Sequence, residues 1–238
     1  MSILPQANPL QQSGQQLLDF LLPGNCLLCG AYSGRSLLCQ SCHDDLPCLP
    51  EASCPQCGEQ SPNGERCGAC LKQAPHFAST RALFRYDFPA DRLIQALKYG
   101  HQLAVAAWLG GHMAEQLRDQ PCDLIIPMPL HPDRLRQRGF NQSVELSRPL
   151  SSALQKPLAL DCLLRTRATP PQAELALKDR ARNVRGAFEC RQEIGERSVL
   201  LVDDVMTSGA TLNECARVLL LHGARRVDVA VAARALKH

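Results

Sequence analysis

The sequence predicts an α/β protein, with a mostly parallel sheet that carries helices on both faces and a small cysteine-rich module in front of it. Two observations support this prediction. From residue 75 onward, apolar segments of strand length alternate with segments whose apolar residues recur at helical spacing. Before residue 75, eight cysteines form four Cys-x-x-Cys pairs. A chain of 238 residues with 45% hydrophobic content is long enough for one ordinary domain and such a module.

Charge and hydropathy narrow the function classes. No run of about twenty apolar residues occurs, and the apolar segment at 17–22 is too short for a signal-peptide core, so we expect no membrane span and a cytoplasmic protein. The net charge of +3 is too small for a protein that coats nucleic acid. Residues 134–197, however, hold eleven Arg and two Lys against seven acidic residues, a local balance of +6 that suits phosphate groups.

The cysteine pairs predict two structural zinc sites in a module over residues 23–74, after an N-terminal segment over 1–22. In a reducing cytoplasm, cysteine clusters more often bind metal than form disulfides. The last two pairs repeat the first two at an offset of 28 residues, and eight thiolates fill two tetrahedral zinc sites with no open position for water. The expected ligands are Cys26, Cys29, Cys39 and Cys42 for one ion and Cys54, Cys57, Cys67 and Cys70 for the other.

Two alternatives to this arrangement stay open at this point. A cross-braced pairing would join cysteine pairs that are separated by 24 residues, whereas the sequential pairing closes shorter loops. The difference in loop-closure entropy is only roughly 1 kcal/mol, so it favours the sequential pairing without deciding it. Redox-active or disulfide-linked cysteines are the second alternative.

The α/β domain is expected over residues 75–238, with a linker at 75–79. Ligands of parallel sheets bind beyond the carboxyl ends of the strands, so the loops after Met128, Leu164 and Val202 should converge on one pocket. The expected elements are a strand at 81–86, helices at 89–97 and 103–117, a strand at 122–128, a helix from 139 to about 154, strands at 158–164 and 199–202, a helix at 212–221 and a strand at 227–232.

Two of these three loops are basic. One follows the strand at 122–128, and the other lies within residues 165–185. Arg134, Arg138 and Arg180 are the candidates for binding and neutralising phosphate oxygens during a reaction, because a guanidinium offers a bidentate fork. The alternative for each of these arginines is a surface salt bridge.

The third loop belongs to the segment Val-Leu-Leu-Val-Asp-Asp-Val-Met-Thr-Ser-Gly-Ala-Thr at 199–211. A buried strand here leads to a helix N-terminus, whose N–H groups and dipole attract a phosphate. Asp203 and Asp204 would repel phosphate, but they accept hydrogen bonds from two vicinal hydroxyls. A phosphorylated ribose carries both a phosphate for the helix N-terminus and vicinal hydroxyls for the two acids. The alternative is a strand-turn-helix connection without a ligand. The expected phosphate-binding residues are Thr207, Ser208, Gly209, Ala210 and Thr211.

These thirteen residues resemble the phosphoribosyl pyrophosphate (PRPP) loop of type I phosphoribosyltransferases. The resemblance implies that Asp203 and Asp204 hold the ribose 2′ and 3′ hydroxyls and that residues 207–211 hold the 5′-phosphate. It further implies that the loop at 129–138 holds pyrophosphate, that Mg²⁺ binds with PRPP, and that residues from about 165 to 185 form a mobile hood over the ligand. Hypoxanthine-type members carry an Asp at the position of Thr207, so the resemblance does not extend to a hypoxanthine or guanine acceptor.

Four cysteine pairs ahead of such a domain, together with the basic segments at 134–142 and 165–183, resemble the ComF family and its GntX branch along nearly the whole chain. The resemblance implies a double zinc ribbon, a type I phosphoribosyltransferase-like domain, and a link to competence, DNA uptake and the use of DNA as a nutrient. We therefore expect a protein that binds PRPP or ribose phosphate. Transferase activity, the acceptor and the oligomeric state are left open, since no residue stands out as a general base.

Two other functions are kept as alternatives. In the first, the zinc module and the basic loops bind single-stranded DNA, although only 4% of the residues are aromatic and the basic stretch offers Phe140 and Phe188 alone for stacking. In the second, the zinc module is an adaptor for other proteins, such as DNA-uptake or competence proteins, on a phosphoribosyltransferase-like domain without turnover.

Overall fold

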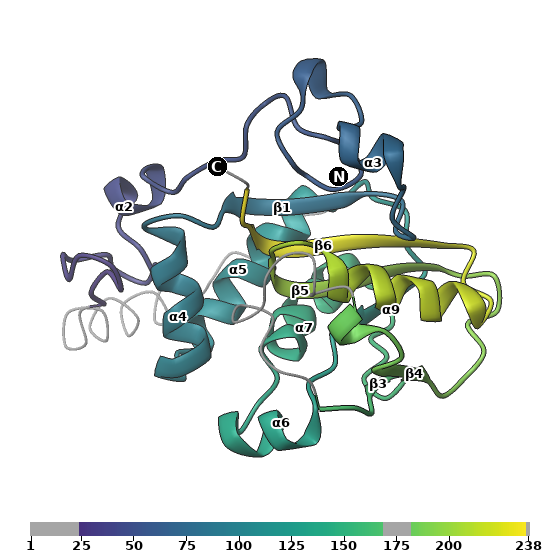
Figure 1. The fold of residues 1–238 in the computed structure, drawn as a ribbon. Helices are drawn as coiled ribbons and strands as arrows, with labels where there is room; N and C mark the ends of the chain where they lie inside the picture. The colour runs from purple at the N-terminus through teal and green to yellow at the C-terminus, as the bar shows by residue number, and fades with distance from the viewer. Residues whose placement is uncertain (1–23, 169–181, 237–238) are drawn as a thin grey trace, which may run out of the picture. The chain divides into compact units, whose positions relative to one another are not determined.

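The computed structural model describes residues 24–168 and 182–236 (Figure 1). The chain divides into two compact units, of which the first ends at Leu46 and the second begins at Pro47. The second unit therefore contains both the second set of cysteines and the α/β sheet. The division by motif at 74/75 stays a prediction, and the N-terminal segment predicted at 1–22 lies outside the described residues.

Both sets of cysteines have the same local fold. In the first unit, a short antiparallel bridge precedes helix α2 (Gln40–Asp44), which begins directly after a cysteine. In the second unit, an equivalent bridge precedes the 3-10 helix η1 (Pro62–Gly64) and helix α3 (Gly68–Lys72), which also begins after a cysteine. The repeat in the sequence is thus a repeat in the structure. The bridged pairs are Asn25 with Tyr32 and Ser53 with Gln60.

Four parallel strands form the central sheet of the second unit, in the order β1-β6-β5-β2. Strand β5 is an inner strand, and its Val202 lies opposite Ala230 of β6 on one side and Pro127 of β2 on the other. All four strands overlap segments that were predicted as strands, and the fold class is confirmed. The strands are β1 (Thr80–Arg85), β2 (Leu124–Pro127), β5 (Ser198–Met206) and β6 (Arg226–Arg234).

Helices cover both faces of this sheet (Figure 1). Helix α9 packs on one face, in a buried cluster that includes Val199 and Leu201 of β5. These residues alternate along the strand with Leu200 and Val202, whose side chains point to the other face. On that face, α5 contacts β1 and β6, and α7 contacts β2 and β5. The helices are α4 (Ala90–Gly100), α5 (Leu103–Gln116), α7 (Gln142–Leu154) and α9 (Ala210–Leu221).

Two boundaries differ from the prediction around the expected pocket. Strand β5 continues to Met206, so the acidic pair lies inside the strand and not in the loop after it. The basic loop after β2 contains a short helix, α6 (Pro132–Arg138). Proline at the first helical position needs no N–H partner, and the ring nitrogen Nδ1 of His131 accepts a hydrogen bond from Asp133 N at 3.3 Å. These local features are sufficient for one short helix.

The strand predicted at 158–164 is wrong in its extent, and the strand that does form there lies outside the central sheet. The segment that forms a strand is β3 (Leu163–Arg165), which pairs antiparallel with β4 (Phe188–Cys190) in a separate two-stranded sheet. The preceding residues make a single bridge beside β2, where Ile125 N donates to Pro157 O at 2.9 Å. The apolar pattern was read correctly as extended chain, but the chain leaves β2 after this bridge.

Within residues 24–168 and 182–236, no helix has the length and apolar content needed to span a lipid bilayer.

Candidate functional site

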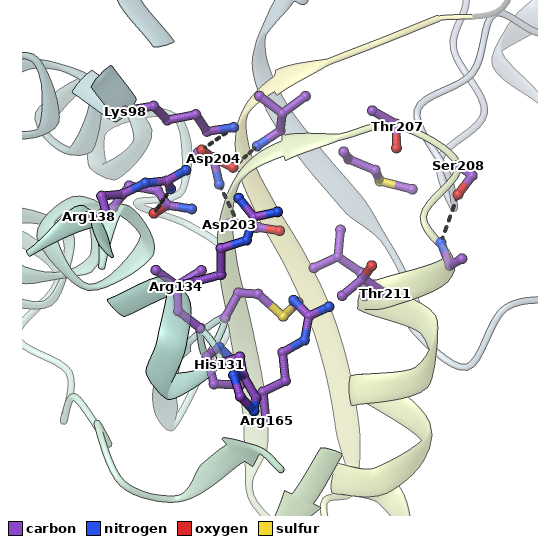
Figure 2. A pocket seen from close by; sticks show the side chains of 18 of the residues that line it. Lys98, His131, Arg134, Arg138, Arg165, Asp203, Asp204, Thr207, Ser208 and Thr211 are labelled. Atoms are coloured by element: carbon purple, nitrogen blue, oxygen red, sulfur yellow. Dashed lines mark hydrogen bonds and ion pairs between the residues drawn. The ribbon is translucent and has the colours of Figure 1, made fainter. Parts of the chain in front are cut away.

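The carboxyl ends of β2 and β5 open into a cavity of about 470 Å³ (Figure 2). Its wall consists of the turn from β5 into α9, the turn before α6 and α6 itself, Arg165 at the end of β3, and the end of α4. The three loops that were expected to converge therefore meet at one cavity. The lining includes all the residues predicted to bind ribose phosphate, namely Asp203, Asp204, Thr207, Ser208, Gly209, Ala210 and Thr211.

Residues 207–211, which are called the phosphate loop after the ligand predicted for them, connect β5 to α9. Gly209 precedes the first helical residue and has φ +76°, a left-handed conformation that glycine adopts without strain. No side chain at this position caps α9, and Ser208 Oγ accepts a hydrogen bond from Ala210 N at 3.3 Å. Thr207 and Ser208 are exposed to solvent. A helix N-terminus of this kind presents N–H groups and a positive dipole end to an anion.

Hydrogen bonds orient the two acids at the end of β5. Asp203 Oδ1 accepts from Ser143 Oγ of α7 and from Asp204 N, both at 2.9 Å. Asp204 is buried, and its Oδ1 accepts from Val205 N at 2.7 Å. Its Oδ2 lies 2.6 Å from Nζ of Lys98, which reaches it from α4 (Figure 2). The acidic pair is thus held by three different elements before any ligand arrives.

The charges of this cluster depend on one another. Burial raises the pKa of Asp203 to about 7, and the neighbouring charge of Asp204 adds to the effect. Burial alone would lower the pKa of Lys98, but the charge of Asp204, its hydrogen bond to Lys98 and the charge of Asp203 together outweigh burial, and the pKa is raised. Lys98 is therefore a cation at neutral pH, and the net charge of the cluster changes near pH 7 when Asp203 loses its proton.

The basic side of the cavity comes from α6 and β3. Arg134 is exposed and lines the same cavity as Asp203 (Figure 2). The Nη1 atom of Arg138 donates to Gln142 Oε1 at 2.5 Å, and its guanidinium lies 5.7 Å from the centre of the Tyr99 ring. Two of the three predicted arginines thus line the cavity, together with Arg165. The third, Arg180, lies outside the described residues.

Three contributors to the site were missed from the sequence: Lys98, Ser143 and Tyr99. Lys98 and Tyr99 directly follow the predicted helix at 89–97, whose apolar spacing describes only the buried face. Ser143 lies in the first turn of α7 and meets Asp203 across 60 residues of sequence. No local pattern pairs these residues with the acids, since only the packing of α4 and α7 brings them there.

Eight of the cysteines form two clusters of four, and within each cluster the sulfur atoms all lie within 4.8 Å of one another. The sequential pairing is confirmed, and the clusters are two zinc-binding sites of four cysteines each. Burial raises the pKa of the Cys54 thiol, but hydrogen bonds from the backbone N–H groups of Cys67, Cys57 and Gln56 act together in the opposite direction, and the pKa is lowered to about 7. This favours the thiolate that zinc binds. The first cluster is Cys26, Cys29, Cys39 and Cys42, and the second cluster is Cys54, Cys57, Cys67 and Cys70.

Comparison with known proteins agrees with this arrangement. Residues 17–71 match the double zinc ribbon domain, and residues 141–237 match the phosphoribosyl transferase domain. DNA utilization protein YhgH of Escherichia coli O157:H7 is 34% identical over 218 residues, which cover 87% of this chain and 96% of that protein. Competence protein F of Haemophilus influenzae is 33% identical over 223 residues, which cover 88% of this chain and 96% of that protein.

Among solved structures, a purine phosphoribosyltransferase from Pyrococcus horikoshii Ot3 is similar over 56% of this chain and 73% of its own, with 20% identity and a TM-score of 0.36. A hypoxanthine phosphoribosyltransferase from Staphylococcus aureus is similar over 53% of this chain and 61% of its own, with 13% identity and a TM-score of 0.35. The fold assignment depends on the parallel sheet and on the matched domain, not on these partial superpositions.

Proposed function

Because the chain belongs to the ComF family of DNA utilization and competence proteins, we propose that its cavity binds PRPP or another ribose 5-phosphate compound. One observation carries this proposal: an acidic strand end and an open helix N-terminus border the same cavity. A phosphate needs N–H donors, and vicinal hydroxyls need acceptors. Ribose phosphate presents both groups within one small molecule.

In the proposed complex, the phosphate loop receives the 5′-phosphate. Gly209 lets the backbone approach the anion closely, and the exposed hydroxyls of Thr207 and Ser208 are additional donors. The carboxylates of Asp203 and Asp204 accept hydrogen bonds from the ribose hydroxyls. Lys98 balances the charge of Asp204, which lowers the repulsion between the acidic pair and the incoming phosphate.

The arginines belong to the pyrophosphate half of PRPP in this proposal. Arg134 and Arg138 line the cavity on the side of α6, and Arg180 is a third candidate. Negative charge grows on the pyrophosphate as its bond to the anomeric carbon breaks, and guanidinium groups neutralise that charge. Mg²⁺, if it binds together with PRPP, would supply further positive charge to the pyrophosphate. Phosphoribosyl transfer would follow when an acceptor reaches the anomeric carbon.

The biological setting comes from the family. The relatives are named for DNA utilization and for competence. We propose that this chain acts on ribose phosphates in the same setting, within a reducing cytoplasm that preserves the thiolates of both zinc sites. Single-stranded DNA and DNA-uptake proteins are the partners that this setting suggests.

Calorimetric titration with PRPP and with ribose 5-phosphate, with and without Mg²⁺, tests the pocket. The double substitution Asp203→Asn and Asp204→Asn should weaken PRPP binding by about 100-fold, the loss of two hydrogen-bonded acceptors. It should leave two zinc ions per chain, because the ligands are elsewhere. Asp119→Asn, at an exposed position, is the control and should bind PRPP as the wild type does. Unchanged PRPP affinity in the double variant would overturn the assignment.

A second candidate function is binding of single-stranded nucleic acid at the mouth of the same cavity. Tyr99 is 73% exposed there, and the Arg138 guanidinium lies 5.7 Å from its ring. An exposed ring beside a cation can stack a base and contact its phosphate. Titration with single-stranded oligonucleotides over a salt series separates the two functions. A steep salt dependence, together with weaker oligonucleotide binding in Tyr99→Ala and no PRPP binding, would favour nucleic acid.

A further inference from the structure

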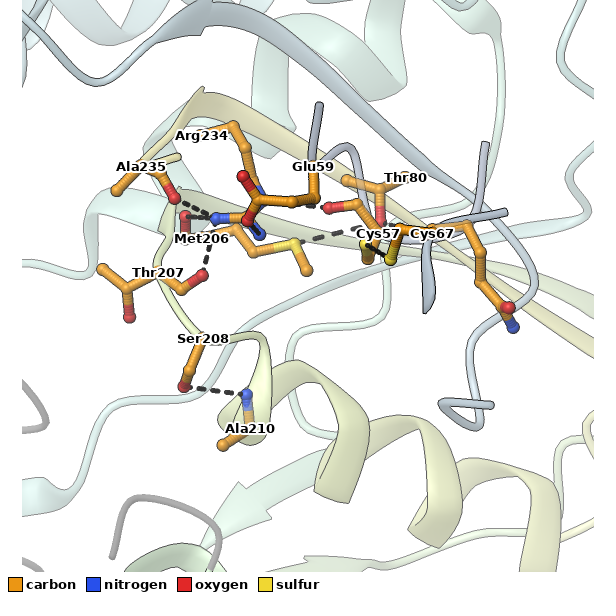
Figure 3. A network of polar contacts seen from close by, with 11 residues as sticks. Cys57, Glu59, Cys67, Thr80, Met206, Thr207, Ser208, Ala210, Arg234 and Ala235 are labelled. Atoms are coloured by element: carbon orange, nitrogen blue, oxygen red, sulfur yellow. Dashed lines mark hydrogen bonds and ion pairs between the residues drawn. The ribbon is translucent and has the colours of Figure 1, made fainter. Parts of the chain in front are cut away.

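Arg234, the last residue of β6, connects the second cluster to the phosphate loop (Figure 3). Its side chain is only 4% exposed. The Nε atom donates to Cys57 O at 2.9 Å, and Nη1 donates to Thr207 O at 2.6 Å and to Met206 O at 3.3 Å. One planar guanidinium therefore bonds both to the turn that carries a zinc ligand and to the backbone that enters the phosphate loop.

The cluster side also supplies the counter-charge for this buried cation. Glu59 Oε2 lies 3.2 Å from Nη2 of Arg234, and Glu59 comes two residues after Cys57. Gly58 lies between them with φ +70°, and a Cβ atom at Gly58 would meet the Arg234 side chain at 3.8 Å. A buried cation needs such a partner in a fixed position. The position of the guanidinium thus depends on the conformation of this turn.

A second chain of contacts runs in parallel. Gln56, between two zinc ligands, donates from Nε2 to Phe77 O at 3.1 Å, and its own carbonyl accepts from Thr80 Oγ1 at 2.7 Å. The Phe77 ring packs beside Gly209, where a Cβ atom would lie 3.8 Å from the ring. The back of the phosphate loop therefore rests on residues that the second cluster holds in place.

We propose that Arg234 is a positioning residue through which zinc in the second cluster sets the conformation of the phosphate loop. Zinc closes the turn at 54–57, since small ribbons of this kind take their shape from the metal. The turn holds the guanidinium, and the guanidinium holds two carbonyl groups at the entry to the loop. The N–H groups that follow are thereby aimed into the cavity. This inference rests on the proposed function, because it takes a ribose phosphate as the ligand of the loop.

Thermodynamic coupling between two sites is reciprocal. If zinc in the second cluster strengthens ribose phosphate binding, then ribose phosphate must stabilise zinc in the second cluster by the same factor. A residue that only supports the fold would not transmit this effect of the ligand. Ligand-dependent protection of the zinc cysteines is therefore the measurement that distinguishes a positioning role from a structural one.

The test compares Arg234→Met with Arg226→Met. Arg226 lies at the other end of β6 and pairs with buried Asp228, with 2.7 Å between Nε and Oδ2, so its loss controls for general destabilisation. Cysteine alkylation in the presence of a chelator is followed by peptide mass spectrometry, which reads each cluster separately. Second-cluster cysteines should react about five- to tenfold faster in Arg234→Met, and first-cluster cysteines at the wild-type rate. Arg234→Lys should be intermediate, because an ammonium lacks the planar fork.

Ribose 5-phosphate is then added to the same reaction. In the wild type, ribose 5-phosphate should slow alkylation of the second cluster about tenfold. The affinity for ribose 5-phosphate should be weakened by about the same factor in Arg234→Met, because the coupling is reciprocal. In Arg234→Met, the protection of the second cluster should be absent. Binding of ribose 5-phosphate without protection of the second cluster in the wild type would overturn the proposal. That comparison needs no variant, so it stands even if Arg234→Met does not fold.

A further measurement separates this inference from the proposed function. Failure of the wild type to bind ribose 5-phosphate would refute the function, but the link between zinc and loop can still be measured by amide hydrogen exchange over residues 205–212. Exchange there should quicken in Arg234→Met and after removal of zinc, and stay at the wild-type rate in Arg226→Met. Unchanged exchange both in Arg234→Met and after removal of zinc would refute the link itself.

Discussion

At the residue scale, the ion pair between Lys98 and Asp204 explains how two adjacent acids are accommodated at a strand end. The Asp204 side chain is 5% exposed and that of Lys98 is 19% exposed. A buried carboxylate without a partner is strongly unfavourable, because the interior does not solvate it as water does. Lys98 removes that penalty, and Asp203 remains the group whose proton responds to pH near 7.

Lys98→Met should therefore lower the free energy of unfolding by about 3 kcal/mol, since Asp204 is left uncompensated. Urea unfolding measures the change. In an Asp204→Asn background the same substitution should have a much smaller effect, as a double-mutant cycle requires of a direct pair. Lys72→Met, at an exposed position, is the matched control. Equal losses in both backgrounds would show that the two charges are not coupled.

The proton of Asp203 predicts a pH dependence with a definite sign. Its folded pKa of about 7 lies above the unfolded value of about 4, so the folded protein binds more protons between these values. The free energy of unfolding must then fall as pH rises through this range. Asp203→Asn has no proton to lose, so its stability relative to the wild type should grow from pH 4 to pH 7 and level off above pH 7 at roughly 4 kcal/mol. Urea unfolding at several pH values checks this, and a constant difference would contradict it.

At the scale of elements, the turn from β5 into α9 combines strand, phosphate loop and helix start within a few residues. Strand β5 carries the acids and α9 presents its N–H groups. Gly209 makes the connection possible, because its left-handed φ of +76° directs the chain from the strand into the helix. The motif therefore places both halves of the proposed sugar phosphate site by backbone geometry.

Gly209→Ala should lose phosphate binding beyond its effect on stability. Alanine at a left-handed φ costs about 1–2 kcal/mol, and the new methyl group would lie 2.6 Å from Met206 Cε. Gly223→Ala, just after the other end of α9 with φ +85°, imposes similar strain away from the cavity. Thermal unfolding should show comparable losses, whereas calorimetry should show weaker ribose 5-phosphate binding in Gly209→Ala alone. Equal affinity in both variants would remove the phosphate loop from the proposed site.

At the scale of the molecule, the two zinc clusters belong to different compact units. The first cluster lies before Leu46, and the second cluster shares its unit with the α/β sheet. The 28-residue repeat thus produced two similar sites with different surroundings. In the second copy, Gln56, Cys57 and Glu59 have partners in the sheet and in the segment that leads to it.

Loss of the two clusters should consequently have unequal effects on the sheet. Cys54→Ser with Cys57→Ser should lower the midpoint of thermal unfolding of the second unit by several degrees, since a zinc site with four cysteine ligands contributes folding free energy directly. Cys26→Ser with Cys29→Ser should leave that transition in place. Calorimetric unfolding with zinc analysis of each protein measures this, and identical shifts would contradict the division into two units.

The sequence predicted the zinc ligands, their sequential pairing, the parallel sheet and the strand that leads into a helix start at 199–211. It did not predict helix α6 or the antiparallel partner of β3. The extended chain at 158–164 would join the central sheet only if it stayed beside β2. The residues of this segment alone do not determine whether it does, and in the structure it pairs with β4 after a single bridge. The role of Arg180 stays a prediction.

What the sequence determined by itself was local: cysteine spacing, apolar alternation, and the order of acids, hydroxyls and glycine at the start of a helix. These signals suffice because metal ligands, strands and helix N-termini are built from residues close together in the chain. Only the tertiary structure decided which distant residues complete the site. Ser143 meets Asp203 across 60 residues, and Arg234 meets Cys57 across 177, because packing of separate elements selects the partners of buried polar groups.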